Sequence, residues 1–253
     1  MLMLVISAGM QKSGSAYLYN IINDLMAASG EADARRVKSK HRLDDILKWH
    51  NNNLVQFRLS HLIRLIRLSQ REGSFAIKSH NGPTFAMRLL LMLGFIKVIY
   101  VYRDPRDVLI SAIDHGKKLL ASGENHTFAK MVEFDKAVAN VCDWVKIWEE
   151  YSTLRRVLRV RYEELLANPR VIAERIVSYL GLTVTSSEID QILWKYNKEN
   201  ENADMRGLHF NKAKVGRFKE ELTVDQCRRI DELLGGKILR MGYKPTLDEI
   251  YAR

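Results

Sequence analysis

The sequence has few cysteines, few prolines and no long apolar run. Its two cysteines, Cys142 and Cys227, provide neither a disulfide framework nor a cysteine-based zinc site, so we expect a reducing, cytoplasmic compartment. The apolar residues 1–6 have no basic segment before them and lead directly into Gln11-Lys12-Ser13, which argues against a signal peptide. No later run approaches the ~20 residues that a membrane span needs, so stable membrane insertion is not expected. With four prolines and no internal repeat, the chain of 253 residues predicts a single domain, 1–253.

Acidic residues are outnumbered by basic ones. The chain has 40 lysines and arginines against 30 aspartates and glutamates, which gives a formal net charge of +10. Hydrophobic residues make up 47% of the sequence, which is too much for a disordered polyelectrolyte and is typical of a folded protein. The excess of positive charge therefore indicates an anionic partner.

Short apolar runs alternate with longer helical patterns along the chain. Four runs predict buried parallel strands, at residues 2–7, 75–78, 96–102 and 157–161. The helical patterns cover residues 15–28, 54–70, 83–93, 106–120, 127–151, 169–179 and 224–234, and Pro83, Pro105 and Pro169 are expected at helix starts. This alternation predicts an α/β fold with a central parallel sheet flanked by helices.

A glycine-containing turn follows the first predicted strand. Residues 8–15 read Ala-Gly-Met-Gln-Lys-Ser-Gly-Ser and lead into a predicted helix. Glycines let backbone N–H groups approach an anion, the helix N-terminus favours negative charge, and Lys12 adds a positive charge. The segment therefore predicts a phosphate-binding loop. It is not a Walker A loop, because Ile6 and Gln11 stand where G-x-x-x-x-G-K-[ST] requires glycine.

Polar residues also follow the second and third predicted strands, at the edge where ligands bind in parallel sheets. Lys78 and His80 are two positions apart, which in an extended segment places an ammonium beside a potential general base. The alternative is a histidine that only caps or packs. Arg103 and Ser111 both donate to oxyanions and would suit one phosphate, whereas Asp104 would suit magnesium. A simple helix start with surface Arg–Asp pairs is the third interpretation.

In this order and spacing, the three segments resemble the cytosolic-type sulfotransferase family. Its members transfer a sulfuryl group from 3'-phosphoadenosine 5'-phosphosulfate (PAPS) and release adenosine 3',5'-bisphosphate (PAP). The resemblance spans most of the chain, and it implies a P-loop-like sulfotransferase architecture without a metal.

The first loop is similar to the P-K-S-G-T-T-W loop that holds the 5'-phosphosulfate in this family. The resemblance implies that Lys12 contacts the reacting end of the donor and that the aromatic ring of Tyr17 stacks on adenine. The other residues that it assigns to donor binding are Gln11, Ser13, Gly14, Ser15 and Ala16, of which Ala16 lacks the family's hydroxyl.

The later segments also have counterparts in the family. Lys78-Ser79-His80 is similar to K-T-H, which implies that His80 is the catalytic base and that Lys78, with Lys12, stabilises charge on the leaving phosphate. Arg103 and Ser111 keep the eight-residue offset of the arginine and serine that bind the 3'-phosphate. Residues 161–165 are similar to the stretch whose tyrosine lies by adenine, here Tyr162.

The basic segment 211–219 suggests, from its residue types alone, either an anion-closing lid or a solvated loop. It aligns with the family's R-K-G-x-x-G-D-W-K, which implies that Asn211, Lys212 and Ala213 contact the 3'-phosphate. Asn211 and Ala213 replace an arginine and a glycine, and Arg217 replaces an aspartate. We therefore expect closure over the 3'-phosphate to be weaker, or to be rebuilt through Lys214 or Arg217.

A short dimer motif of the family, K-x-x-x-T-V-x-x-x-E, is only partly present. Lys219, Thr223 and Val224 are in register with it, but Arg228 occupies the glutamate position. In a two-fold contact this substitution would occur twice and replace attraction by repulsion. We therefore expect a monomer, or a dimer that does not use this motif.

Two basic segments have no counterpart in these motifs. The predicted helix 54–70 is amphipathic and carries Arg64 and Arg67, with Arg71 beyond it, so it suits either anionic lipid or nucleic acid, or simply a solvated face over a core stripe. We favour the solvated face. Residues 35–42 form a basic run that suits either a nucleic-acid patch or a mobile loop near the acceptor mouth, and we favour the loop.

The sequence thus predicts an enzyme that transfers a sulfuryl group from PAPS to a hydroxyl or amine of a small-molecule acceptor, with His80 as general base. No nucleic-acid partner and no metal are expected. The alternatives are a P-loop kinase that uses ATP and magnesium, and a non-enzymatic module that binds nucleic acid or an anionic membrane. The acceptor itself is not identified by any motif.

Overall fold

The computed structural model describes residues 2–123, 127–197, 199, 200, 202 and 214–245. The chain divides into two compact units. The first contains residues 1–102 and 148–209, and the second contains residues 103–147 and 210–253.

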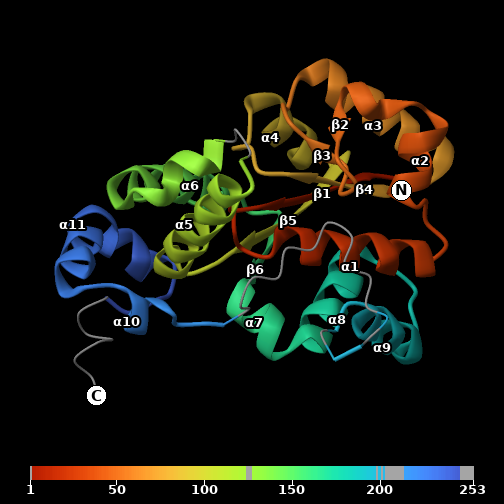
Figure 1. The fold of residues 1–253 in the computed structure, drawn as a ribbon. Coiled ribbons are helices and arrows are strands. Elements are labelled where there is room, and N and C mark those ends of the chain that lie inside the picture. Colours follow the sequence, from red (N-terminus) through yellow and green to blue (C-terminus); the bar gives the residue numbers. More distant parts are fainter. Residues whose placement is uncertain (1, 124–126, 198, 201, 203–213, 246–253) are drawn as a thin grey trace. The chain divides into compact units, whose positions relative to one another are not determined.

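The first unit is built on a six-stranded sheet with the order β2-β3-β4-β1-β5-β6 (Figure 1). The central strand β1 (Leu4–Gly9) runs parallel to β4 (Phe75–Ser79) and to β5 (Ile96–Tyr102), and β6 (Val157–Arg161) extends the sheet beyond β5. On the other side, β3 (Asn53–Leu54) is parallel to β4 and the edge strand β2 (Leu47–Lys48) is antiparallel. The α/β prediction is confirmed, and the four predicted strands are the four long ones.

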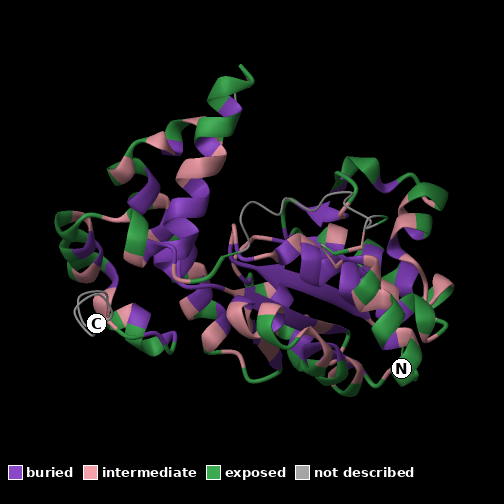
Figure 2. Ribbon diagram, turned by 60° about the horizontal axis from the view of Figure 1, so that its bottom comes forward, coloured by how far each residue is buried: buried purple, intermediate pink, exposed green. Residues whose placement is uncertain are grey.

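Helices cover both faces of this sheet, and Figure 1 shows α3 and α4 on the opposite side from α1 and α8. The central strands β1 and β4 are wholly buried, and β5 is mostly so, as Figure 2 shows. The helices of the first unit are α1 (Ser15–Ala28), α2 (Ala34–Lys40), the 3-10 turn η1 (Leu43–Asp45), α3 (Leu59–Glu72), α4 (Phe85–Met92), α7 (Tyr162–Ala167), α8 (Pro169–Leu180) and α9 (Ser186–Lys195).

Three local predictions for this unit are wrong. Of the predicted mobile loop 35–42, residues 35–40 lie in helix α2, because the side chain of Asp33 caps the helix by accepting from the backbone N–H groups of Arg35 and Arg36. Helix α3 begins at Leu59 instead of residue 54, since Leu54 belongs to β3. Pro83 does not begin α4, because the hydroxyl of Thr84 accepts from the backbone N–H of Met87 and caps that helix.

The second unit is helical. It contains α5 (Pro105–Ala121), the 3-10 segment η2 (Thr127–Val132), most of α6 (Phe134–Ser152), the short α10 (Phe218–Glu221) and α11 (Val224–Arg240). The single helix predicted over residues 127–151 is thus divided into η2 and α6. Helix α11 continues six residues past the predicted end at residue 234, through Gly235 and Gly236.

None of the helices in the described ranges is long and apolar enough to cross a bilayer.

Two glycines give a test of the packing. A Cβ on Gly9 would lie 2.6 Å from Cγ1 of Val101, whereas a Cβ on Gly236 would meet nothing within 4 Å. We expect Gly9→Ala to lower the free energy of unfolding by about 1–3 kcal/mol, because a close-packed neighbour must move. Gly236→Ala should raise it by about 0.5–1 kcal/mol through helix propensity. Urea denaturation followed by circular dichroism measures both free energies of unfolding. If Gly9→Ala leaves the free energy of unfolding unchanged, the close approach at Gly9 is contradicted.

Candidate active site

The loop between β1 and α1 has the backbone of an anion site. Gly14 has φ of +74° and precedes the first turn of α1, where the N–H groups of a helix are unpaired. Lys12 also adopts a left-handed conformation, with φ of +61°, which is uncommon for a residue with a side chain and is typical of functional loops. The hydroxyl of Ser13 donates to the carbonyl oxygens of Met10 and Val101 and fastens the loop to β5. The predicted phosphate-binding loop therefore has the expected strand–loop–helix setting.

Two tyrosines predicted near adenine lie at this loop. The ring of Tyr162 is packed so closely against Gly14 that a Cβ there would lie 2.6 Å from its Cε2 atom. Tyr17 is buried on α1, and burial, followed by the interaction with Tyr162, raises its pKa. The structure thus brings Tyr17 and Tyr162 to one end of α1, although the two are far apart in sequence.

A third tyrosine at this end of α1 was missed by the sequence analysis. Tyr196 meets Tyr17 edge to face, with ring centroids 6.4 Å apart, and its hydroxyl donates to the carboxylate of Asp24 at 2.6 Å. Lys195 and Arg35 also bind that carboxylate. Desolvation alone would raise the pKa of Asp24, but the donors around it hold the pKa below its ordinary value. An aromatic residue just after a helix gives no sequence signal that distinguishes it from ordinary core.

His80 lies just past the end of β4 and is held through both ring nitrogens. Its Nδ1 is 2.7 Å from the carbonyl oxygen of Gly9, and its Nε2 is 2.6 Å from Nζ of Lys78. A carbonyl oxygen only accepts, so Nδ1 carries the proton and Nε2 accepts from the lysine. This assignment makes the imidazole neutral and fixes its tautomer.

The electrostatics agree with this tautomer. Burial, then the charge of Lys78, lower the pKa of His80 to about 3, with a smaller effect from Lys12, while the hydrogen bond to Gly9 acts in the opposite direction. Burial also lowers the pKa of Lys78 to about 7. Lys78 and His80 are therefore brought together as the two-residue spacing predicts.

The segment after His80 is anchored by residues that the sequence analysis did not identify. The side-chain amide of Asn81 donates to the backbone carbonyl oxygens of Leu54 and Val55. The backbone carbonyl oxygen of Asn81 accepts from the hydroxyl of Tyr151 at 2.9 Å. Ser79 donates to the carbonyl of Leu54 as well. These contacts restrain the backbone on both sides of His80, which keeps the imidazole at the end of β1.

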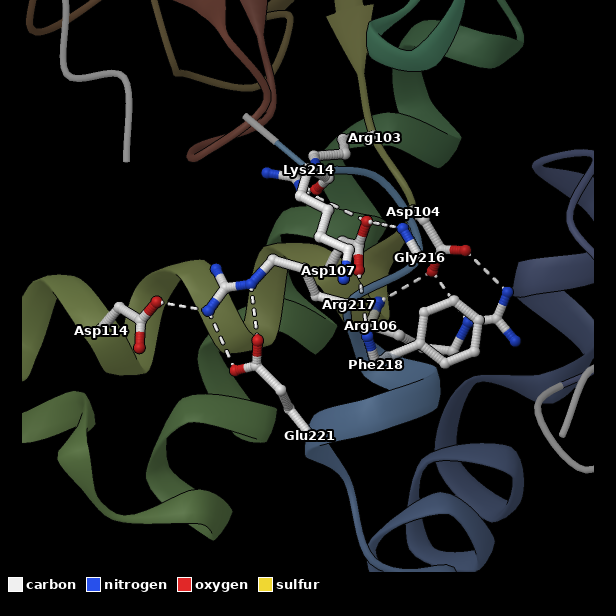
Figure 3. Close-up of polar contacts among 10 residues, drawn as sticks. All are labelled: Arg103, Asp104, Arg106, Asp107, Asp114, Lys214, Gly216, Arg217, Phe218 and Glu221. Atoms are coloured by element: carbon white, nitrogen blue, oxygen red, sulfur yellow. Dashed lines mark hydrogen bonds and ion pairs between the residues drawn. The ribbon is translucent and has the colours of Figure 1, made fainter. Parts of the chain in front are cut away.

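In the second unit, Arg103 and the first turn of α5 are organised around the buried carboxylate of Asp107 (Figure 3). That carboxylate accepts from Nη2 of Arg103 at 3.2 Å and from the backbone N–H groups of Gly216 at 2.8 Å and Phe218 at 3.3 Å. Arg103 also donates to the carbonyl oxygen of Lys214 at 2.9 Å. The predicted 3'-phosphate ligand Arg103 is thus joined to the described part of the predicted closing segment.

Ser111, the other predicted 3'-phosphate ligand, is buried on α5. Asp104 does not have the setting of a magnesium ligand. Its carboxylate makes two contacts with the guanidinium of Arg106, at 2.9 and 2.6 Å, and caps α5. Arg106 in turn lies over the ring of Phe218 at 3.8 Å. Across the described ranges, no three His, Cys, Asp or Glu side chains form a group suited to a metal ion.

Arg217, which replaces the family's aspartate, has a structural role. Its side chain is 2% exposed, and its guanidinium binds Asp114 at 2.6 Å and Glu221 at 2.8 Å. Lys214 is exposed and pairs with Glu220. The geometry therefore gives no support to a phosphate contact rebuilt through Arg217. Asn211, Lys212 and Ala213 lie outside the described residues.

Comparisons with known proteins identify the family of the chain. Residues 4–242 match the family model described as "Sulfotransferase domain". The chain is 30% identical to a 3-beta-hydroxysteroid sulfotransferase of Cavia porcellus, over 93% of this chain and 83% of the relative. It is 28% identical to an amine sulfotransferase of Oryctolagus cuniculus, over 74% of this chain and 68% of the relative.

Among solved structures, a mouse sulfotransferase complexed with PAP matches with a TM-score of 0.61 at 21% identity, covering 94% of this chain and 85% of that one. A retinol dehydratase in complex with retinol and PAP matches with a TM-score of 0.58 at 18% identity, covering 93% and 81%. These two similarities concern the fold. Because the family model covers nearly the whole chain and the fold agrees with it, this protein belongs to the sulfotransferase family and is an enzyme.

Proposed function

We propose that this sulfotransferase transfers a sulfuryl group from PAPS to a hydroxyl or amine of a small-molecule acceptor, with His80 as general base. The observation that carries the proposal is the neutral imidazole, fixed by Gly9 at the end of β1, where the anion-binding loop begins. A base of fixed tautomer beside a phosphate-type loop is the arrangement that transfer from an anionic donor to a protonated nucleophile requires.

The loop residues would hold the donor's 5' end. Residues 11–16, with the first turn of α1, offer backbone N–H groups and the Lys12 ammonium to the phosphosulfate. Tyr17 and Tyr162 supply aromatic surface for the adenine. The resemblance assigns the 3'-phosphate to Arg103 and Ser111, and to Asn211, Lys212 and Ala213 beyond the described residues. Similar proteins solved with PAP support this donor.

His80 would accept the acceptor's proton on Nε2, the nitrogen that receives a hydrogen bond from Lys78. Lys78 must therefore turn from His80 before the base is available. A phosphosulfate beside Lys78 would favour this movement, because the buried ammonium would exchange its hydrogen bond to His80 for one to an anion. As the acceptor oxygen or nitrogen bonds to sulfur and the bond from sulfur to the phosphate oxygen breaks, Lys12 and Lys78 stabilise the charge on that oxygen.

Two alternatives from the sequence lose support. Family membership removes the non-enzymatic module. A P-loop kinase needs an aspartate for magnesium, and the carboxylate of Asp104 is occupied by Arg106. We also propose that the protein works in the cytoplasm without a nucleic-acid partner.

We propose a monomer, or a dimer that does not use the family motif. In the structure Arg228 pairs with the exposed Asp225 at 3.1 Å, and Thr223 caps α11 through a capping box with Gln226. The Asp225 carboxylate reduces the repulsion expected from Arg228, but it does not restore the attraction that a glutamate would provide across a two-fold axis.

Donor recognition is tested by thermal shift. We expect PAP to raise the melting temperature equally with and without a chelator, because side chains and loop amides neutralise its phosphates. Arg103→Ala should weaken PAP binding far more than binding of adenosine 5'-phosphate, whereas the matched Arg228→Ala should change neither. Stabilisation by ATP with magnesium that equals or exceeds that by PAP would instead support the kinase.

The base assignment is tested by His80→Asn. We expect kcat to fall by about 10²–10⁴-fold, because no group takes the acceptor proton, while PAP affinity changes little. His41→Asn is the control, since His41 binds Glu72 on the surface. If His80→Asn retains turnover and His115→Asn loses it, the base is His115, whose ring packs 5.0 Å from that of Phe128.

The buried ammonium of Lys78 predicts a pH dependence of stability. Its pKa of about 7 in the folded protein lies below its usual value of 10.5. Between pH 7 and pH 10.5 the unfolded chain binds more protons than the folded protein, so the free energy of unfolding rises with pH. The destabilisation by the buried ammonium of Lys78 is therefore fully present below pH 7 and disappears as the pH rises to 10.5. We therefore expect Lys78→Met to be more stable than wild type at neutral pH and to lose this advantage near the upper value. If the difference in free energy of unfolding between Lys78→Met and wild type, measured by urea denaturation, does not change with pH, the burial of this charge is contradicted.

A further inference from the structure

Helix α4 turns an apolar face to solvent. Phe85, Leu89 and Met92 are 82%, 40% and 63% exposed, and their i, i+4, i+7 spacing places them on one side of the helix. Met87 and Leu91 point into the core. An amphipathic surface helix normally exposes polar residues on the side away from the core. Helix α4 is unusual because both its core-facing side and its solvent-facing side are apolar.

The apolar surface continues past the end of α4. Leu93 and Phe95 are 55% and 37% exposed in the turn that leads to β5. Leu2, which is 44% exposed, lies close to this turn, because the backbone N–H of Leu4 donates to the carbonyl of Phe95. We call Phe85, Leu89, Met92, Leu93 and Phe95 the α4 surface. Contiguous apolar surface of this kind usually marks a site of contact with a protein or a membrane.

Arginines lie beside this surface. The guanidinium of Arg156 donates to the carbonyl oxygen of Met92 at 2.9 Å, and Arg155 next to it is also exposed. Helix α3 contacts α4 and exposes Arg67 and Arg71 on its solvent side. Within the described part of the chain, none of these four arginines makes an ion pair, whereas Arg88 on α4 itself is paired with Glu150.

We propose that the α4 surface docks this enzyme on an anionic membrane surface. Lipid headgroups offer phosphates to the arginines while the acyl boundary receives the apolar side chains, so one occupant satisfies both features. A second copy of the chain suits the surface less well, because a two-fold contact would bring Arg155 and Arg156 of both copies together. Docking is peripheral, it requires no spanning helix, and it is independent of the donor and base proposed above.

Vesicle flotation of the full chain tests this proposal. We expect binding to vesicles of phosphatidylcholine mixed with phosphatidylglycerol, little binding to phosphatidylcholine alone, and a decrease with salt. Phe85→Ser combined with Met92→Ser should weaken binding roughly tenfold or more, because the inserted apolar area is lost. The matched control is Trp194→Ser on α9, whose side chain is 52% exposed and which should bind as wild type does. Melting temperatures establish that each variant is folded.

The contribution of the arginines to vesicle binding is tested by separate variants. Arg155→Glu with Arg156→Glu should weaken binding by about fivefold or more per arginine, whereas Arg228→Glu with Arg229→Glu makes the same change in net charge and should have a small effect. Failure of the wild type to bind, equal binding to neutral vesicles, or unchanged binding by the Phe85→Ser, Met92→Ser protein would each overturn the proposal. A concentration-dependent dimer that the same variant dissociates would assign the surface to a second copy of the chain.

Discussion

The hydrogen bond from His80 to the carbonyl oxygen of Gly9 connects the ends of two neighbouring parallel strands. It selects the tautomer of the imidazole, and it leaves Nε2 as the nitrogen that can receive a proton. Gly9 is also the residue at which the predicted phosphate-binding loop leaves β1. The imidazole and this loop are therefore positioned by the same backbone group, and the sheet register between β1 and β4 fixes both.

Burial gives this pair its chemical character. In water an ammonium and an imidazole would both be solvated, and neither would depend on the other. At the end of β4 the ammonium of Lys78 has lost most of its water and is held by the lone pair of His80. In the mechanism proposed above, His80 is the base, and it is thus covered by a cation that favours an incoming anion. That mechanism links donor binding to activation of the base through the side chain of Lys78.

Much of the fold follows from local patterns in the sequence. The strands at 96–102 and 157–161 and helix α1 have the predicted bounds, because apolar runs of strand length and helical periodicity occur there without competing signals. Strands β2 and β3 have two residues each, too few for any periodicity. Helix α2 was missed because its basic residues suggested a loop, although Asp33 is a recognisable N-cap. The contacts that complete the site were not predictable, since His80 and Gly9, or Tyr196 and Asp24, meet only through the tertiary fold.

The surroundings of Arg217 bear on engineering by family consensus. Replacing an unusual residue by the one most common among relatives is a standard way to raise stability. At position 217 the family motif has aspartate, which would stand beside Asp114 and Glu221 and would remove the guanidinium that pairs with both carboxylates. Three carboxylates would then share a partly buried space, where like charges repel strongly. The unusual residue and its acidic neighbours form one unit, so a consensus library for this enzyme must vary all three positions together.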